Sequence, residues 1–229
     1  MGQRLYSFGN GARHAILTVR RKPYMEIELK YNIPHMEDYD SIWENKLFAE
    51  YEEEDSREEL HLNAKYYDTD DFALAKNEIA YRIRKEGDEL VAALKWKGHS
   101  ENGLHVREEI NIPVRDFEPD PEVFLESRVG SEAMALLLND KLQCVMETII
   151  DRKRFRIDSG KGIYEISLDK GQVVTAYGSV PLCEVEIELF SGPQEDLIEI
   201  GRRLQEAYEL IPEDTSKYGR GMDIIREHQ

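Results

Sequence analysis

Charged and apolar residues alternate strictly in several short segments of this chain. Residues 26–30 read Glu-Ile-Glu-Leu-Lys, and residues 184–188 read Glu-Val-Glu-Ile-Glu. A period of two is typical of a β-strand with two unlike faces. Side chains two positions apart share a face and lie about 6.5–7 Å apart. Each segment therefore predicts a row of carboxylates that needs a metal ion or a basic neighbour to balance its charge.

The hydrophobic pattern predicts an antiparallel sheet system with three amphipathic helices. We expect one helix over residues 36–54 and another over residues 194–210. A third is expected to begin at Ser131, a favourable N-cap residue, and to continue through Val145. Gly87-Asp88, Ser159 to Gly162 and Lys170-Gly171 predict turns between strands. The expected strands cover residues 24–32, 64–68, 81–85, 90–97, 104–114, 151–158, 163–169, 172–177 and 182–190.

The polar faces of these strands carry charges in blocks of one sign. The solvent face of an ordinary half-buried sheet usually mixes both signs with neutral polar residues, which are nearly absent here. The acidic positions are Glu26, Glu28, Glu109, Glu165, Asp169, Glu184, Glu186 and Glu188, and the basic positions are Lys30, Arg82, Arg84, Lys95, Lys97, Arg107, Arg152, Arg154 and Arg156.

Converging faces of this kind could pair with one another or jointly hold an anionic, metal-bound ligand. Polyphosphate with Mg²⁺ or Mn²⁺ meets both demands, because arginine and lysine neutralise phosphate oxygens and carboxylates hold hard cations. The apolar faces would then point outward beneath the helices. The pattern thus predicts an α+β fold, a closed antiparallel β-barrel with a charged interior and helices outside.

Composition limits the classes of protein to consider. The chain has 229 residues, 41% of them hydrophobic and 34% charged, with a formal net charge of −17. Nonspecific binding to nucleic acid or membranes is therefore not expected. Two cysteines without a Cys-x-x-Cys motif, and no apolar run long enough to span a membrane, favour a cytoplasmic protein. We interpret residues 1–23 as an N-terminal extension and 24–229 as one domain.

The sequence resembles the CYTH, or triphosphate tunnel metalloenzyme, superfamily, from about residue 24 to 222. Its hallmark Glu-x-Glu-x-Lys is matched by residues 26–30, and the order of the later motifs agrees. These are Tyr67-Asp68-Thr69, Arg82-Ile-Arg84, Lys95-x-Lys97, Arg107-x-Glu109, Arg154-x-Arg156, Glu165-x-x-x-Asp169, Glu184-x-Glu186-x-Glu188 and Ser216-Lys217-Tyr218. The resemblance implies an eight-stranded antiparallel tunnel.

The resemblance also implies roles for single residues. Glu26, Glu28 and Lys30 would be catalytic, and Lys30 would bind phosphate or assist proton transfer. Arg152 and Glu165 stay unassigned. The triphosphate would be bound by Arg82, Arg84, Lys95, Lys97, Arg107, Arg154, Arg156 and Lys217. One or two divalent cations, Mg²⁺ or Mn²⁺, would be held by Glu26, Glu28, Glu109, Asp169, Glu184, Glu186 and Glu188.

We therefore expect a metal-dependent triphosphatase, with inorganic tripolyphosphate as substrate because no separate base-binding motif is present. Adenylate cyclase and thiamine triphosphatase activity would use the same residues, so the motifs do not separate them. A polyphosphate-binding module without catalysis, and a purely structural network of ion pairs, are the other readings. Ion pairs at this density without a ligand would stabilise a fold poorly. The sequence leaves a homodimer open.

Overall fold

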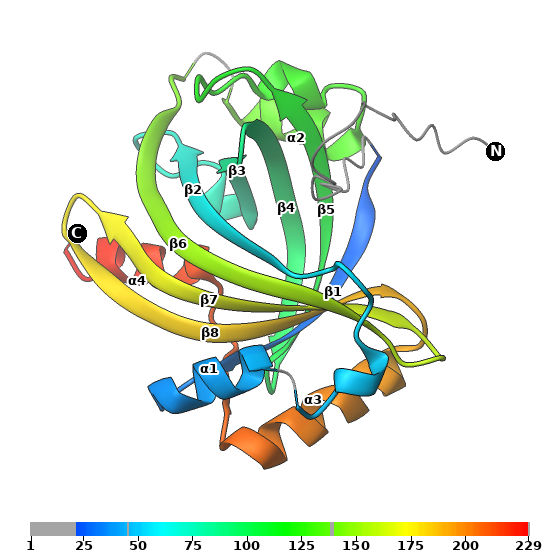
Figure 1. The fold of residues 1–229 in the computed structure, drawn as a ribbon. Coiled ribbons are helices and arrows are strands. Elements are labelled where there is room, and N and C mark those ends of the chain that lie inside the picture. Colours follow the sequence, from blue (N-terminus) through cyan, green and yellow to red (C-terminus); the bar gives the residue numbers. More distant parts are fainter. Residues whose placement is uncertain (1–21, 45, 138–139, 229) are drawn as a thin grey trace.

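Eight antiparallel strands close into a barrel in the computed structural model of this chain, which describes residues 22–44, 46–137 and 140–228 (Figure 1). The strands follow the order β5-β4-β3-β2-β6-β7-β8-β1, and β1 also pairs with β5, which closes the ring. The α+β barrel predicted from the sequence is thereby confirmed. The strands are β1 (Tyr24–Asn32), β2 (Glu58–Asp68), β3 (Ile79–Glu86), β4 (Glu89–Glu101), β5 (Leu104–Val114), β6 (Gln143–Asp158), β7 (Ile163–Thr175) and β8 (Gly178–Ser191), and the short β9 (Ile211–Pro212) pairs with β1.

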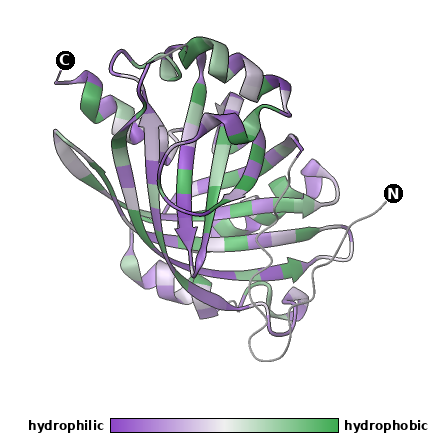
Figure 2. Ribbon diagram, turned by 90° about the horizontal axis from the view of Figure 1, so that it is seen from above, coloured by the Kyte–Doolittle hydropathy of each residue, from purple (hydrophilic) through white to green (hydrophobic). Residues whose placement is uncertain are grey.

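The outward faces of the strands are apolar and are covered by helices. Figure 2 shows hydrophilic and hydrophobic positions following one another along the strands. Ile166 and Ile187 face outward and share a core with Ile42 of α1 (Met36–Glu44) and Leu197 of α3 (Gln194–Tyr208). A second core joins β3, β4 and β5 to α2 (Arg128–Leu137). Single helical turns are η1 (Ala49–Tyr51), η2 (Ala75–Asn77) and η3 (Pro121–Phe124).

The last helix, α4 (Lys217–Arg226), packs differently from the other three. Its Met222 and Ile225 share a core with Val173 of β7. Val173 lies four positions after Asp169 on the same strand, so both side chains belong to the face that carries the charges. A Cβ added at Gly221 would lie 2.4 Å from the Met146 sulfur, which shows how closely α4 approaches β6. The helix thus brings its first residue, Lys217, to the charged side of the sheet.

The helix predicted over 36–54 ends ten residues early. Arg57 Nη1 donates a hydrogen bond to the Trp43 carbonyl at 2.6 Å, and a continuing helix would use that carbonyl for its own backbone. The predicted apolar stripe still packs, because Leu47 and Tyr51 contact the same core from the following turns. The periodicity therefore identified buried positions correctly and the helix length incorrectly.

The other corrections concern the middle of the chain. The helix expected after Ser131 begins at Arg128, where the Ser127 hydroxyl accepts a hydrogen bond from the Gly130 amide at 3.0 Å. Val145 belongs to β6, which begins eight residues before the strand predicted at 151–158. β7 is one strand where a turn at Lys170-Gly171 was expected. Gly171 permits close pairing there, since a Cβ would lie 2.1 Å from the Ile149 carbonyl oxygen.

Two expectations from the sequence concern the ends of the chain and the membrane. The predicted extension over residues 1–23 falls almost wholly outside the described residues. In the part of the chain that the structure describes, no helix combines the length and the apolar character needed to cross a membrane.

Replacing Leu197 with alanine tests the packing of α3 on the barrel. Leu197 is fully buried, so Leu197→Ala should lower the free energy of unfolding by about 2–5 kcal/mol through the cavity it leaves. Ile198, the next residue on the same helix, is 46% exposed, and Ile198→Ala should change stability by less than about 0.5 kcal/mol. Urea unfolding of both variants measures the difference, and equal losses would contradict the assignment of the buried face.

Candidate functional site

The interior of the barrel contains a cavity of about 380 Å³. Charged side chains from most strands of the barrel and from α4 line it, because alternate residues of each strand point inward. Cavities of this size bind small molecules in other proteins. The residues expected at the site that line it are Glu26, Glu28, Lys30, Arg82, Arg84, Lys95, Arg107, Glu109, Arg154, Glu186, Glu188 and Lys217.

The first group of charges joins β1, β4 and β5. The Lys95 ammonium lies 3.0 Å from both oxygens of Glu26 and 2.5 Å from Glu109. Arg107 donates to Glu26 through Nε and to Glu28 through Nη2, the latter at 2.7 Å. Burial alone would raise the pKa of Glu26, but Arg107 and Lys95 outweigh it and hold the pKa well below its usual range. Glu26 is therefore ionised.

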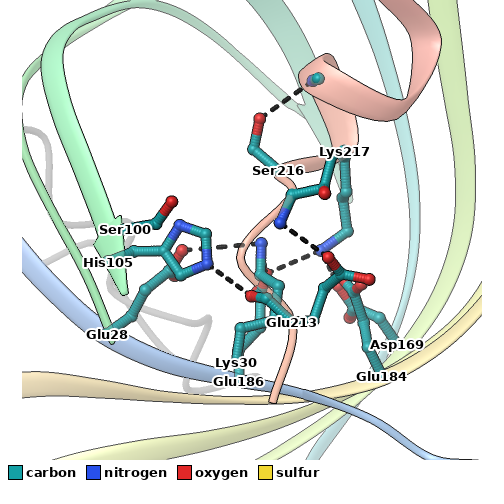
Figure 3. Close-up of polar contacts among 12 residues, drawn as sticks. Glu28, Lys30, Ser100, His105, Asp169, Glu184, Glu186, Glu213, Ser216 and Lys217 are labelled. Carbon is teal, nitrogen blue, oxygen red and sulfur yellow. Dashed lines mark hydrogen bonds and ion pairs between the residues drawn. The ribbon is translucent and has the colours of Figure 1, made fainter. Parts of the chain in front are cut away.

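The second group surrounds Lys217, the first residue of α4, in Figure 3. Carboxylate oxygens of Asp169, Glu184 and Glu186 lie within 4.8 Å of one another, and all three residues are buried. The Lys217 ammonium is 2.9 Å from Asp169 and 2.8 Å from Glu186, and it also contacts Glu184. Arg152 donates to Asp169 at 2.6 Å and to Glu186 at 2.8 Å. This carboxylate trio is thus held by cations of the chain itself.

A short segment before α4 anchors Lys217 in place. The Glu213 carbonyl forms a hydrogen bond of 2.8 Å with His105 Nε2 (Figure 3). The Asp214 carboxylate accepts one of 2.6 Å from the Gly103 amide. The Ser216 hydroxyl caps α4 by accepting from the Gly219 amide at 3.0 Å. These contacts position the start of the helix.

Lys30 lies deeper in the barrel, beside the same acids. Its ammonium is 3.0 Å from Glu186 and 3.7 Å from Glu28, and the residue is almost completely buried. Burial alone would lower the pKa of Lys30, but Glu186, Glu184 and Glu28 together raise it above its usual value. Lys30 is therefore a permanent positive charge near neutral pH.

A third group centres on Arg154. Its guanidinium lies 2.6 Å from Glu58, 3.0 Å from Glu86 and 3.5 Å from Glu165. Arg84 approaches Glu86 at 3.0 Å from the other side. Three acids therefore bind Arg154 firmly, which leaves Arg84 with one shared partner.

Arg82 and Arg84 carry more positive charge than the carboxylates beside them neutralise. The Nε atoms of both side chains are buried without a hydrogen-bond partner, and the ion pair between Arg82 and Glu109 spans 3.7 Å. Burial, with repulsion from Arg82 and Arg152, lowers the pKa of Arg84. Buried donors without partners are costly, so this wall of the cavity is suited to an anion.

Glu188 has carboxylates as neighbours and no cation to neutralise its charge among the described residues. This residue faces Glu28 across the β1–β8 pair and Glu165 across the β7–β8 pair. Within the described residues, no hydrogen bond or ion pair joins its carboxylate to a cation. Burial and repulsion from Glu26, Glu165, Glu28 and Glu109 raise its pKa well above the usual range. Glu188, beside Glu28 in the acidic row formed by Glu26, Glu28 and Glu188, thus lacks a cation, whereas Lys95, Arg107 and Lys30 bind the other two.

Four residues expected at the site do not line the cavity. Asp169 and Glu184 lie behind it, beneath Lys217 and Arg220, and Arg156 lies 3.7 Å from Glu53 with a half-buried side chain. The expectation that Lys97 faces the interior and binds the triphosphate does not agree with the structure. A bulge between Trp96 and His99 and a positive φ of 53° turn its side chain outward, where it is 69% exposed and contacts Glu108.

Sequence reasoning did not assign several residues that complete these groups. Glu86 has the same strand phase as Arg82 and Arg84, so alternation alone could have identified it. Glu58 belongs to a part of β2 that was not predicted as a strand. Arg220 binds Glu184 at 2.7 Å from α4, a helix that the polar composition of the tail concealed. Tyr218, Met222 and Ile225 are nevertheless spaced helically after the Ser216 cap.

Comparison with known proteins agrees with this architecture. The model of the CYTH domain family matches residues 25–222. The chain belongs to the CYTH domain family. An inorganic triphosphatase of Haemophilus influenzae is 31% identical over 162 residues, which are 71% of this chain and 45% of that protein. The chain thus spans about half the length of this curated relative.

Solved structures of other proteins share the fold. A putative adenylyl cyclase from Hippeastrum, described as having a dominant triphosphatase activity, superposes with a TM-score of 0.63. The match covers 86% of this CYTH chain and 95% of that one, at 15% identity. A putative adenylate cyclase from Bacillus halodurans gives a TM-score of 0.53 at 21% identity, over 85% and 95% of the two chains. At these identities the likeness concerns the fold alone.

Replacing Glu188 with glutamine tests the charge imbalance in this CYTH domain. The raised pKa means that ionised Glu188 opposes folding, so Glu188→Gln should stabilise the metal-free protein at pH 8, by on the order of 1 kcal/mol. The gain should grow as the pH rises above about 4.5, the usual glutamate value, because only the ionised form is penalised. Thermal unfolding in EDTA from pH 4 to 8 measures this. A loss of stability at pH 8 would show that Glu188 has a favourable partner.

Proposed function

We propose that this CYTH domain hydrolyses a triphosphate with the help of a divalent cation, and that inorganic tripolyphosphate is its substrate. One observation carries the proposal. The cavity holds arginine donors without partners on one wall and a carboxylate without a cation on another. A polyanion bound together with a divalent cation satisfies both at once.

The anion would lie against Arg82 and Arg84, whose free Nε atoms can donate to phosphate oxygens. Lys95 and Arg107 would add positive charge from β4 and β5, the next two strands of the barrel. Phosphoryl transfer depends mainly on in-line positioning and on neutralising the charge of the transferred and leaving groups. A fixed guanidinium wall supplies both, because its dipoles need no rearrangement when the reaction occurs.

Mg²⁺ or Mn²⁺ would be held by Glu26, Glu28 and Glu188, with Glu109 and Glu186 nearby. The donor chemistry fits, since hard divalent cations prefer carboxylate oxygens and Glu188 has no competing partner among the described residues, and Glu26 and Glu28 would exchange part of their contact with Lys95 and Arg107 for the cation. When bound, the cation supplies charge neutralisation and makes a nearby water molecule more acidic. The carboxylates of the row would orient that water toward the phosphate.

Lys30 would act as a fixed charge in this scheme. Its raised pKa keeps it protonated, so it serves poorly as a proton acceptor. Lying between Glu186 and Glu28, it would bridge these two carboxylates and fix their positions at the cavity. We therefore assign Lys30 to the positioning of the acidic row.

The substrate assignment rests on the relatives and on the lining of the cavity. The Haemophilus influenzae relative is an inorganic triphosphatase, and the Hippeastrum protein is described as having a dominant triphosphatase activity. Charged side chains line the cavity at both the arginine wall and the acidic row and make up just over half of its lining residues. A free tripolyphosphate has charge over its whole length, so it suits this lining better than an ester with a large organic group.

A side-by-side assay tests the proposed function. Purified protein with Mg²⁺ or Mn²⁺ should release phosphate from tripolyphosphate faster than from ATP or thiamine triphosphate, and EDTA should stop the release. Cyclic AMP formed from ATP would identify a cyclase instead, and faster turnover of thiamine triphosphate would identify that substrate. Tight binding of tripolyphosphate without turnover of any of the three would make the domain a binding module.

Replacing Arg84 with glutamine tests the anion-binding wall. A hydrogen bond to a charged group contributes about 1.5–3 kcal/mol, so Arg84→Gln should lower kcat/KM for tripolyphosphate by roughly 10- to 100-fold. Lys97→Gln removes the same charge from the outside of the barrel and should leave kcat/KM within about twofold, since Lys97 is exposed. Equal effects of the two variants would mean that overall charge, and not the wall, attracts the substrate.

A further inference from the structure

Two stacked tyrosines face the cavity beside the arginine wall that Arg82 and Arg84 form. Tyr66 of β2 and Tyr218 of α4 both line the cavity, and their rings stack with centroids 5.4 Å apart and planes inclined by 30°. Tyr66 is buried, and Tyr218 packs against the apolar core to which Tyr66 belongs. The two residues are distant in the sequence, so the stack forms only when α4 docks on the charged side of the sheet.

Tyr66 lies beside Arg82. The two residues are partners in the register of β2 and β3, and the side chains of such a pair share one face of the sheet. Burial alone would lower the pKa of Arg82, but Tyr66, Glu109 and Glu26 together raise it. The phenol is therefore next to the guanidinium, and a phenol oxygen can accept a hydrogen bond from such a donor.

Arg82 has few other supports. Among the described residues its only ion pair, with Glu109, spans 3.7 Å, and its Nε has no hydrogen-bond partner. Arg107 and Arg152, by contrast, each donate hydrogen bonds to two carboxylates. A carboxylate that binds a guanidinium closely competes with an incoming anion, whereas a phenol carries no charge near neutral pH. Tyr66 can thus hold Arg82 without neutralising it.

Tyr218 is itself fixed from two directions. Its helix is capped two residues earlier by Ser216. Burial and the nearby Asp68 carboxylate raise the pKa of Tyr218. Asp68 is in turn fixed, because it accepts hydrogen bonds of 2.8–2.9 Å from three backbone amides of the loop that follows β2. The stacked ring of Tyr66 therefore rests on a partner that both α4 and this loop hold in place.

We propose that Tyr66, supported by Tyr218, positions Arg82 for anion binding. The stacked pair would hold the guanidinium toward the cavity, and it would link the docking of α4 to the affinity of the arginine wall. The inference rests on the proposed function in taking tripolyphosphate as the anion that Arg82 binds. Both tyrosines are positioning residues, because they act through Arg82.

Isothermal titration calorimetry with tripolyphosphate in EDTA measures the affinity of the wall without turnover. Tyr66→Phe keeps the stack and removes only the hydroxyl, so the Kd should rise about 3- to 10-fold, the effect of one hydrogen bond. Tyr67→Phe is the matched control. It removes the hydroxyl that donates to the Phe117 carbonyl outside the barrel, and it should leave the Kd within about twofold. An equal rise in both variants, or no rise in Tyr66→Phe, would overturn the inference.

A double-mutant cycle with Arg82→Gln separates positioning from a general effect on the fold. Arg82→Gln alone should raise the Kd roughly 10- to 100-fold. Adding Tyr66→Phe should then raise it by less than about twofold more, because no guanidinium is left to hold. A full additional loss in the double variant would mean that Tyr66 acts independently of Arg82, which contradicts the inference.

The role of the stack is tested at Tyr218. Tyr218→Phe keeps the aromatic ring and should stay within about twofold of the wild-type Kd, whereas Tyr218→Leu removes the ring and should raise the Kd about 3- to 10-fold. Wild-type affinity in Tyr218→Leu would refute the support by Tyr218.

The same titrations distinguish this inference from the proposed function. Absence of tripolyphosphate binding in EDTA would overturn the inference and leave the proposed function standing, because hydrolysis takes place with the cation bound. Coupling between Tyr66 and Arg82 in a protein that hydrolyses no triphosphate would support the inference and overturn only the proposed function.

Discussion

Charge balance inside a closed barrel is the constraint on which this structure depends. A strand that alternates charged and apolar residues must bury one set once the sheet closes, and in this chain the charged set faces inward. Desolvating so many charges is expensive unless each finds partners. Arg107, Arg152 and Arg154 each bind two or three carboxylates, which largely meets this requirement. The network leaves the Arg84 Nε and the Glu188 carboxylate without partners among the described residues, and the proposed ligand would supply them.

The apolar outer layer offsets the free-energy cost of burying these charges. Hydrophobic burial is the main favourable contribution to folding, and here it comes from the reverse side of the same strands. Ile166 and Ile187 pair across β7 and β8 and are fully buried in the outer core with α1 and α3, whereas the flanking pairs, Glu165 with Glu188 and Ser167 with Glu186, face the interior. Gly201 lets α3 approach closely, since a Cβ there would lie 2.4 Å from Leu29. The apolar cores covered by α1, α2 and α3 and the charged residues of the site thus belong to opposite faces of one sheet.

Strand phase could be predicted from the sequence because it depends only on local alternation. Glu26, Glu28 and Lys30 face inward as the period of two requires, and the same rule places Arg82 and Arg84. The rule failed for Lys97 because a bulge between Trp96 and His99 changes the phase of the strand, and the local sequence does not indicate the bulge. The partners of each charge could not be predicted either. Arg154 meets Glu58 across a strand pair that forms only when distant segments come together, and register between strands leaves no trace in a single strand.

The C-terminal helix shows how far such local reasoning extends. Met222 and Ile225 carry a helical spacing, yet nothing in that spacing indicates that the helix packs on the charged side of the sheet. The small residue Gly221 permits the approach to Met146, and the approach in turn places Lys217 among three carboxylates. A lysine at the start of a helix ordinarily opposes the helix dipole. Here the buried acids outweigh that penalty, because they raise the pKa of Lys217 well above its usual range in spite of its burial. An unfavourable local choice is thus maintained by tertiary contacts with Asp169, Glu184 and Glu186.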